Sequence, residues 1–192
     1  MLFVFLVVGQ SLFYSCHIAH DREIICYDNL KNATDLAYKN PNNKASLDSA
    51  LIIVNRCMKC DSIKTAVVDL KIRLLITLGK FKEGSDFINS LQESDFTFPY
   101  KKSLNQDNFI ALNFASKLDT VSRDKVYQKM SAYLDGYIKN NNLKSKEFQE
   151  AFSDLNALSK NFIDSISLNR LIDSLQIKYP DEEKFLNFFK HQ

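Results

Sequence analysis

The most constraining feature of this sequence is the recurrence of apolar residues at helical spacing, in stretches of about fifteen residues. Short segments rich in Asn, Gly or Pro interrupt the pattern, most clearly Asn40-Pro41-Asn42-Asn43 and Asn140-Asn141-Asn142. The predicted helices cover residues 23–40, 46–61, 66–79, 81–91, 109–118, 122–138, 148–162, 168–177 and 181–190. Four glycines and three prolines in 192 residues are too few for the turns of an all-β fold. The sequence therefore predicts an all-α protein.

The composition is that of an ordinary globular protein, with 45% hydrophobic and 25% charged residues. About 175 residues remain once an N-terminal leader is set aside, which suits one domain with a sizeable core. We therefore expect a single domain over residues 23–192. The formal net charge of +2 at pH 7 is spread along the chain without a basic block. Because a nucleic-acid binder carries a clustered basic surface, we expect no DNA or RNA partner.

The N-terminus begins with an apolar block from Met1 to Tyr14 that closes at Cys16, and charged residues follow at positions 21–23. The block has the length of a signal peptide and is too short to span a bilayer as a stable helix. We expect a signal peptide over residues 1–15 and a short tether over residues 16–22. The alternative is a buried first helix of a cytosolic protein.

The residues before Cys16 resemble the lipobox of bacterial lipoproteins. Phe13 supplies the apolar residue three positions before the cysteine, and Ser15 supplies the small residue just before it. This resemblance implies that Cys16 becomes the acylated N-terminus and holds the protein on a membrane. It also implies a location in the cell envelope of a Gram-negative bacterium, on the outer membrane and facing the periplasm.

A period of 34 residues relates two neighbouring predicted helix pairs. The matched pairs are Leu47 with Phe81, Ala50 with Gly84, Val54 with Ile88, and Cys57 with Leu91. The string Leu78-Gly79-Lys80-Phe81-Lys82-Glu83-Gly84 resembles the turn of a tetratricopeptide repeat (TPR). This resemblance implies antiparallel helical hairpins stacked as a short TPR-like solenoid. An irregular helical bundle is the alternative.

Three residues of this repeat turn have predicted structural roles. A glycine at position 79 suits the left-handed conformation that often follows a helix end. The resemblance implies that Phe81 is buried between the two helices of the hairpin and that Gly84 allows the second helix to approach the first closely.

Cysteines provide the clearest chemical motif in the chain. Cys57 and Cys60 have the two-residue spacing of redox and zinc motifs, and His17 and His20 are the nearest further candidate ligands. Structural thiols are the favoured interpretation. Because Cys26 and Cys57 are nearly equidistant from the turn at residues 41–42, we predict a disulfide between them, with Cys60 as the alternative partner.

Catalytic chemistry has no recognisable centre in this sequence. The three histidines lie near the chain ends, and no Ser or Cys occurs in a known nucleophile turn. We expect no enzymatic activity, no catalytic residues, no cofactor and no metal site. Tyr133 and Tyr137 share one face of a predicted helix and could form a binding strip, although core packing is the favoured role.

These features together predict a non-enzymatic cell-envelope lipoprotein whose TPR-like helices bind a protein or peptide. One alternative is an immunity or inhibitor protein that neutralises a secreted toxin. Another is a thiol redox or metal-binding protein that uses Cys57 and Cys60.

Overall fold

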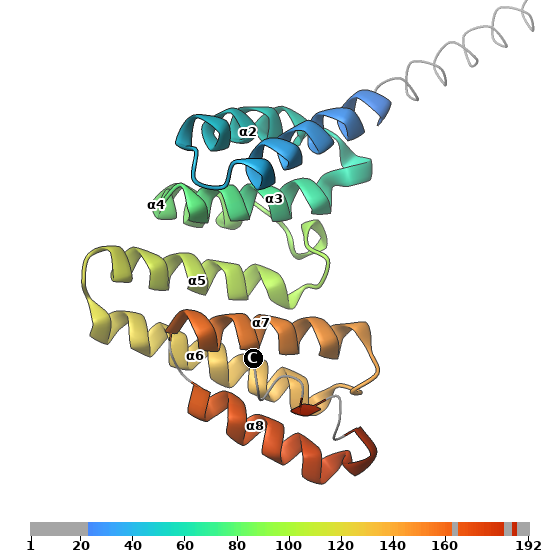
Figure 1. Cartoon of the computed structure of the whole chain (residues 1–192), viewed down its shortest axis with the longest axis vertical. Coiled ribbons are helices and arrows are strands. Elements are labelled where there is room, and N and C mark those ends of the chain that lie inside the picture. The colour runs from blue at the N-terminus through green and yellow to red at the C-terminus, as the bar shows by residue number, and fades with distance from the viewer. Residues whose placement is uncertain (1–22, 163–164, 183–185, 188–192) are drawn as a thin grey trace, which may run out of the picture. The chain divides into compact units, whose positions relative to one another are not determined.

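A computed structural model describes residues 23–162, 165–182 and 186–187 (Figure 1). This part of the chain contains helices and no strands, so the predicted all-α class is confirmed. The predicted signal peptide, the tether, and Cys16, His17 and His20 within that tether lie outside the described residues.

The helices follow one another with short connections. A helix over residues 23–39 comes first. It is followed by α2 (Lys44–Cys57), α3 (Lys64–Thr77), α4 (Phe81–Asn89), α5 (Tyr100–Ser116), α6 (Thr120–Asn140), α7 (Lys146–Phe162) and α8 (Ser165–Lys178). Single 3-10 turns occur at η1 (Asp61–Ile63), η2 (Glu93–Asp95) and η3 (Pro180–Glu182). The largest difference from the predicted bounds is at α5, which begins at Tyr100, whereas the predicted helix covers residues 109–118. Pro99 directly precedes α5, at a position where the missing N–H of proline costs no helical hydrogen bond.

Two compact units make up the chain, one ending at Lys102 and the other beginning at Ser103. The single domain over residues 23–192 that the sequence suggests stays a prediction. The physical basis of the division is that the hairpins pack mainly on their sequence neighbours, such as α2 on α3 and α6 on α7. Each unit is therefore described separately.

In unit 1, α3 is the central helix, because it packs against α2 and also against α4 (Figure 1). Its buried residues are distributed around much of the helix: Val67, Val68, Leu70, Ile72, Leu74 and Leu75. A helix that is apolar on most sides is typical of an element with neighbours on several sides. Lys71 extends towards α4, where its Nζ lies 4.0 Å from the centre of the Phe87 ring. Burial lowers the pKa of this lysine, and Glu83 partly opposes that effect.

In unit 2, α7 packs against both α6 and α8. The fully buried rings of Phe148 and Phe152 stack with their centres 5.9 Å apart, one turn from each other on α7. Lys129 of α6 pairs with Asp107 of α5 at 2.8 Å. The Lys178 ammonium at the end of α8 donates to the Lys139 carbonyl at the end of α6, at 2.9 Å. These contacts tie all four helices of the unit together.

The end of α3 is closed by a glycine in the left-handed conformation, as the sequence predicts. Gly79 has a φ of 68°. Its N–H donates to the Ile76 carbonyl at 3.0 Å, and the Lys80 N–H donates to the Leu75 carbonyl at 2.9 Å. These two bonds form a Schellman motif, which satisfies carbonyls that the end of a helix would otherwise leave without a donor.

The end of α5 has the same motif with a leucine in place of the glycine. Leu118 has a φ of 61°, and its side chain is 87% exposed. The Leu118 N–H donates to the Ala115 carbonyl, and the Asp119 N–H donates to the Phe114 carbonyl, each at 3.1 Å. A leucine here carries the steric cost of a left-handed residue without gaining burial.

We expect opposite effects from substitutions at these two matched positions. Leu118→Gly should raise the free energy of unfolding by about 0.5–1 kcal/mol, because the left-handed strain disappears and no buried contact is lost. Gly79→Ala should lower it by about 1 kcal/mol. A Cβ at position 79 would meet nothing within 4 Å, so this cost comes from the backbone alone. Urea unfolding followed by circular dichroism measures both changes, and effects of the same sign would contradict the prediction.

Candidate functional site

The cysteine pairing differs from the favoured prediction. Cys26 is bonded to Cys60, with Cα atoms 6.1 Å apart, and Cys57 is a free thiol. The preferred Cys26–Cys57 pairing is therefore wrong, and the alternative partner is the one observed. Cys57 lies on the buried stripe of α2 with Leu51 and Val54, and this stripe is turned away from solvent. Two residues at equal distances from the turn of a helical hairpin lie at the same level along the two helices. Their side chains need not point towards each other, because that depends on the direction of each side chain around its helix axis.

The Cys57 thiol is only 1% exposed. Burial raises its pKa, which disfavours the reactive thiolate. In the described part of the chain, no three His, Cys, Asp or Glu side chains gather where they could hold a metal ion. In the folded state, Cys60 of the CxxC pair is therefore part of a disulfide with Cys26, and Cys57 is a buried thiol.

The repeat-turn residues differ in burial. Gly79 has the predicted left-handed backbone, and Gly84 is buried on α4. Phe81 is only partly buried, which corrects the expectation of a fully enclosed ring. The reason is its position as the first residue of α4, because helical side chains point back towards the N-terminus and so towards the open turn.

Tyr133 and Tyr137 lie on one face of α6 with their ring centres 6.4 Å apart. Tyr133 is 45% exposed, whereas Tyr137 is partly buried. Burial is the main cause that raises the pKa of Tyr137, and the nearby Glu147 adds to it. The pair is thus neither wholly core nor wholly surface, and its role in binding stays a prediction.

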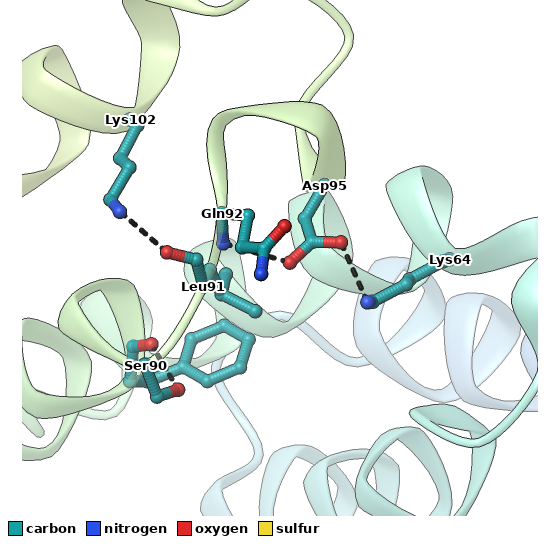
Figure 2. Close-up of polar contacts among 7 residues, drawn as sticks. Lys64, Ser90, Leu91, Gln92, Asp95 and Lys102 are labelled. Atoms are coloured by element: carbon teal, nitrogen blue, oxygen red, sulfur yellow. Dashed lines mark hydrogen bonds and ion pairs between the residues drawn. The ribbon is translucent and has the colours of Figure 1, made fainter.

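A polar cluster holds the segment after α4 against α3 (Figure 2). Asp95 is 8% exposed, and its carboxylate accepts from the Lys64 ammonium at 2.6 Å and from the Gln92 backbone N–H at 3.0 Å. These two bonds hold the pKa of Asp95 below its ordinary value, and the same pair raises the pKa of Lys64. The Lys102 ammonium donates to the Leu91 carbonyl at 2.5 Å. The three charged groups of this cluster, on Lys64, Asp95 and Lys102, each bond to another group of the protein. We therefore assign the cluster a structural role.

An apolar pocket of about 280 Å³ opens in unit 1 between the 23–39 helix, the start of α2 and the end of α3. Its walls include three buried leucines, Leu47, Leu70 and Leu74, together with Ala37 and Pro41. Its polar groups are few: Tyr38, Arg73 and Thr77. A mostly apolar pocket with a few convergent polar groups is the usual composition of a ligand site.

Arg73 supplies the positive charge of this pocket. Its guanidinium donates to the Tyr38 hydroxyl at 2.7 Å, so the two side chains hold each other at the pocket. Among the described residues, no carboxylate forms an ion pair with Arg73. By contrast, the nearby Lys80 is paired with Asp48 at 3.1 Å. A guanidinium without an acidic partner beside an apolar surface is suited to a carboxylate carried by an apolar group.

A larger cleft of about 350 Å³ lies in unit 2, lined by residues of α6, α7 and α8. Its walls are more polar, with Gln128, Ser131 and Ser174 among them. Lys139, one of its two cations, is neutralised by Asp135 at 2.7 Å. We therefore regard the smaller Arg73 pocket as the better candidate, because its walls are more apolar and its guanidinium is held in place by the Tyr38 hydroxyl.

Sequence reasoning did not single out Tyr38 or Arg73. The available signal was a cation at position 73 inside the apolar run from Leu70 to Ile76, where a charged side chain interrupts the pattern. The partner residue, Tyr38, lies 35 positions earlier, and nothing local to it indicates the contact.

No protein-family model matches this sequence, and no curated protein or solved structure gives a match. None of the described helices is both long and apolar enough to cross a membrane.

Proposed function

We propose that this chain is a lipid-anchored, non-enzymatic scaffold of the bacterial cell envelope that binds a protein or peptide segment in the Arg73 pocket. The observation that supports it most is the guanidinium of Arg73, held by Tyr38 at an apolar pocket without an acidic partner among the described residues. The ligand segment that fits carries an acidic group next to an apolar side chain, because the first matches Arg73 and the second matches the leucine walls.

A TPR-like arrangement of hairpins in unit 1 is part of this proposal. Burial supports it, because positions separated by 34 residues have similar environments. Leu47, Ala50, Val54 and Cys57 of α2 are buried, and so are Gly84, Ile88 and Leu91 in and after α4. Phe81 is the exception, since it is only partly buried. The Gly79 turn between α3 and α4 is a second supporting feature.

Charge reversal in the pocket tests the binding proposal. Affinity capture from envelope extract with the full chain should recover a partner whose yield falls at least about tenfold with Arg73→Glu, because a like charge then faces the acidic ligand group. Arg56→Glu is the matched control, since Arg56 is an exposed arginine of α2 that does not line the pocket. Equal recovery with both variants would contradict the proposal, and a captured toxin would favour the inhibitor alternative.

The lipid anchor is supported by the apolar block that ends at Cys16 and by the lipobox-like Phe13 and Ser15. The Cys26–Cys60 disulfide also supports secretion, since such bonds persist mainly in oxidising compartments. We expect mass spectrometry of the native protein to find a diacylglyceryl group on Cys16 and no residues before it. Cys16→Ala should move the protein from the membrane to the soluble fraction. An intact segment over residues 1–15 on the native protein would refute the anchor.

A further inference from the structure

Three cysteines meet at the C-terminal end of α2. Cys60 is bonded to Cys26, and Cys57 is the last residue of α2. The Cys60 N–H donates to the Cys57 carbonyl at 2.9 Å, which closes a tight turn of four residues. The backbone of Cys60 is therefore held next to that of Cys57, while its sulfur bonds Cys26.

The turn geometry suits a second disulfide. A four-residue turn of this kind keeps its first and last Cα atoms within about 7 Å. Disulfides span Cα separations of about 4.4–6.8 Å. The observed Cys26–Cys60 bond, with Cα atoms 6.1 Å apart, lies within that range. The turn also permits a Cα separation in that range for Cys57 and Cys60, provided that the Cys57 side chain turns out of the core. Cys60 is thus the cysteine that could form a disulfide with either Cys26 or Cys57.

Burial of Cys57 keeps this second bond from forming in the closed state. Its side chain is directed into the core with Leu51 and Val54, and not towards solvent. Cys57 is nonetheless the final residue of α2, and the last turn of a helix frays more readily than its middle. Opening that turn would free the thiol while Cys60 stays within reach.

We propose that Cys57, Cys60 and Cys26 form a thiol–disulfide exchange site in which Cys60 passes from Cys26 to Cys57. The Cys57 thiol loses its proton to solvent, and the thiolate attacks the Cys60 sulfur. The Cys57–Cys60 bond forms as the Cys60–Cys26 bond breaks, and Cys26 leaves as a thiolate that takes up a proton. One disulfide and one thiol exist before and after the step, so no oxidant or reductant is consumed.

This exchange releases the 23–39 helix from its covalent link to the end of α2. The same helix supplies Ala37 and Tyr38 to the Arg73 pocket, and Tyr38 accepts from Arg73. Release of the helix would therefore loosen one wall of that pocket. This consequence for binding rests on the proposed function, whereas the exchange itself does not.

Trypsin separates all three sulfurs, so peptide mapping can follow the exchange directly. Cleavage after Lys and Arg places Cys26 in residues 23–31, Cys57 in residues 57–59 and Cys60 in residues 60–64. The starting bond joins 23–31 to 60–64, whereas the exchanged bond joins 57–59 to 60–64. The full chain is incubated in native buffer at mildly alkaline pH with a low concentration of iodoacetamide, which traps each thiol as it appears.

We expect label to accumulate on Cys26 together with a bond between 57–59 and 60–64. Cys57→Ala lacks the attacking thiol, so its Cys26 labelling should be at least about tenfold slower. Label confined to Cys57, a new bond between 23–31 and 57–59, or equal Cys26 labelling in Cys57→Ala would each overturn the proposal.

A second variant tests the turn geometry without requiring exchange. Cys26→Ser leaves two thiols, and oxidised glutathione should convert them to the Cys57–Cys60 disulfide. The amides of residues 23–39 should exchange hydrogen faster in Cys26→Ser than in the parent, with or without glutathione, because the substitution itself removes the covalent link. Cys57 and Cys60 that stay free, or that each carry glutathione, would overturn the proposal. Neither readout involves a ligand, so failure here and failure of the Arg73 binding test are distinguishable.

Discussion

Replacing both Cys26 and Cys60 with serine should lower the free energy of unfolding of unit 1 by about 3–4 kcal/mol. The disulfide closes a loop with a sequence separation of 34 residues, and the chain-entropy model gives a stabilisation of that size for such a loop. Both serines can keep contact with solvent, because Cys26 and Cys60 are only partly buried. Urea unfolding followed by circular dichroism, under oxidising conditions, measures the difference.

Reduction provides an independent measurement of the same quantity. Dithiothreitol should lower the stability of the parent protein by a similar amount and should leave the double serine variant unchanged. Cys57→Ala is the matched control, because it removes the remaining thiol of the cluster without touching the bond. A larger loss in Cys57→Ala than in the double variant would mean that Cys57, and not Cys60, holds the 23–39 helix.

The cysteine pairing shows where sequence reasoning reaches its limit. The spacing argument rested on a count along the chain, in which Cys26 and Cys57 are nearly equidistant from the turn between their helices. Pairing also depends on which way each side chain points around its helix, and that direction follows from the buried stripe. Cys57 shares the apolar spacing of Leu51 and Val54, so its place in the core could have been inferred from the same periodicity that predicted the helix.

Local signals predicted the helices and the turn at Gly79, because apolar spacing and a left-handed glycine depend on a few neighbouring residues. The same logic missed Leu118, where the chain takes up the glycine-type conformation with a residue that disfavours it. Directly after Leu118, the Asp119 carboxylate caps the start of α6 by accepting from the Ser122 N–H at 3.0 Å. A local signal for the start of α6 was therefore present at this turn, whereas a glycine to mark the end of α5 was not.

The candidate site was not predictable because it depends on contacts between helices that are distant in sequence. Tyr38 and Arg73 come from different hairpins, and their hydrogen bond forms only when the 23–39 helix lies near the end of α3. The predicted tyrosine pair on α6 could be inferred because Tyr133 and Tyr137 are one helical turn apart. Spacing within a helix can therefore be inferred from sequence, whereas the hydrogen bond between Arg73 and Tyr38 is a property of the folded unit.

Phe148→Ala should be among the most destabilising single substitutions in unit 2, with an expected loss of about 3–5 kcal/mol. The Phe148 ring is fully buried near the start of α7, where it stacks on Phe152 at 5.9 Å. Truncation removes the transfer energy of the ring and leaves a cavity that the packed helices α6 and α7 can only partly fill. Its backbone cap is unaffected, because the Ser145 hydroxyl accepts from the Phe148 N–H and not from the side chain.

Two further variants test whether burial of the Phe148 ring causes that loss. Phe148→Leu keeps most of the apolar volume, so its cost should fall to about 1–2 kcal/mol. Ile177→Ala removes an apolar side chain of the same unit that is 85% exposed, and its stability should stay within about 0.5 kcal/mol of the parent. Chemical unfolding of the three variants gives the ranking. If Phe148→Ala cost no more than Ile177→Ala, the Phe148 ring would not be enclosed by α6 and α7, and the packing assigned to unit 2 would be wrong.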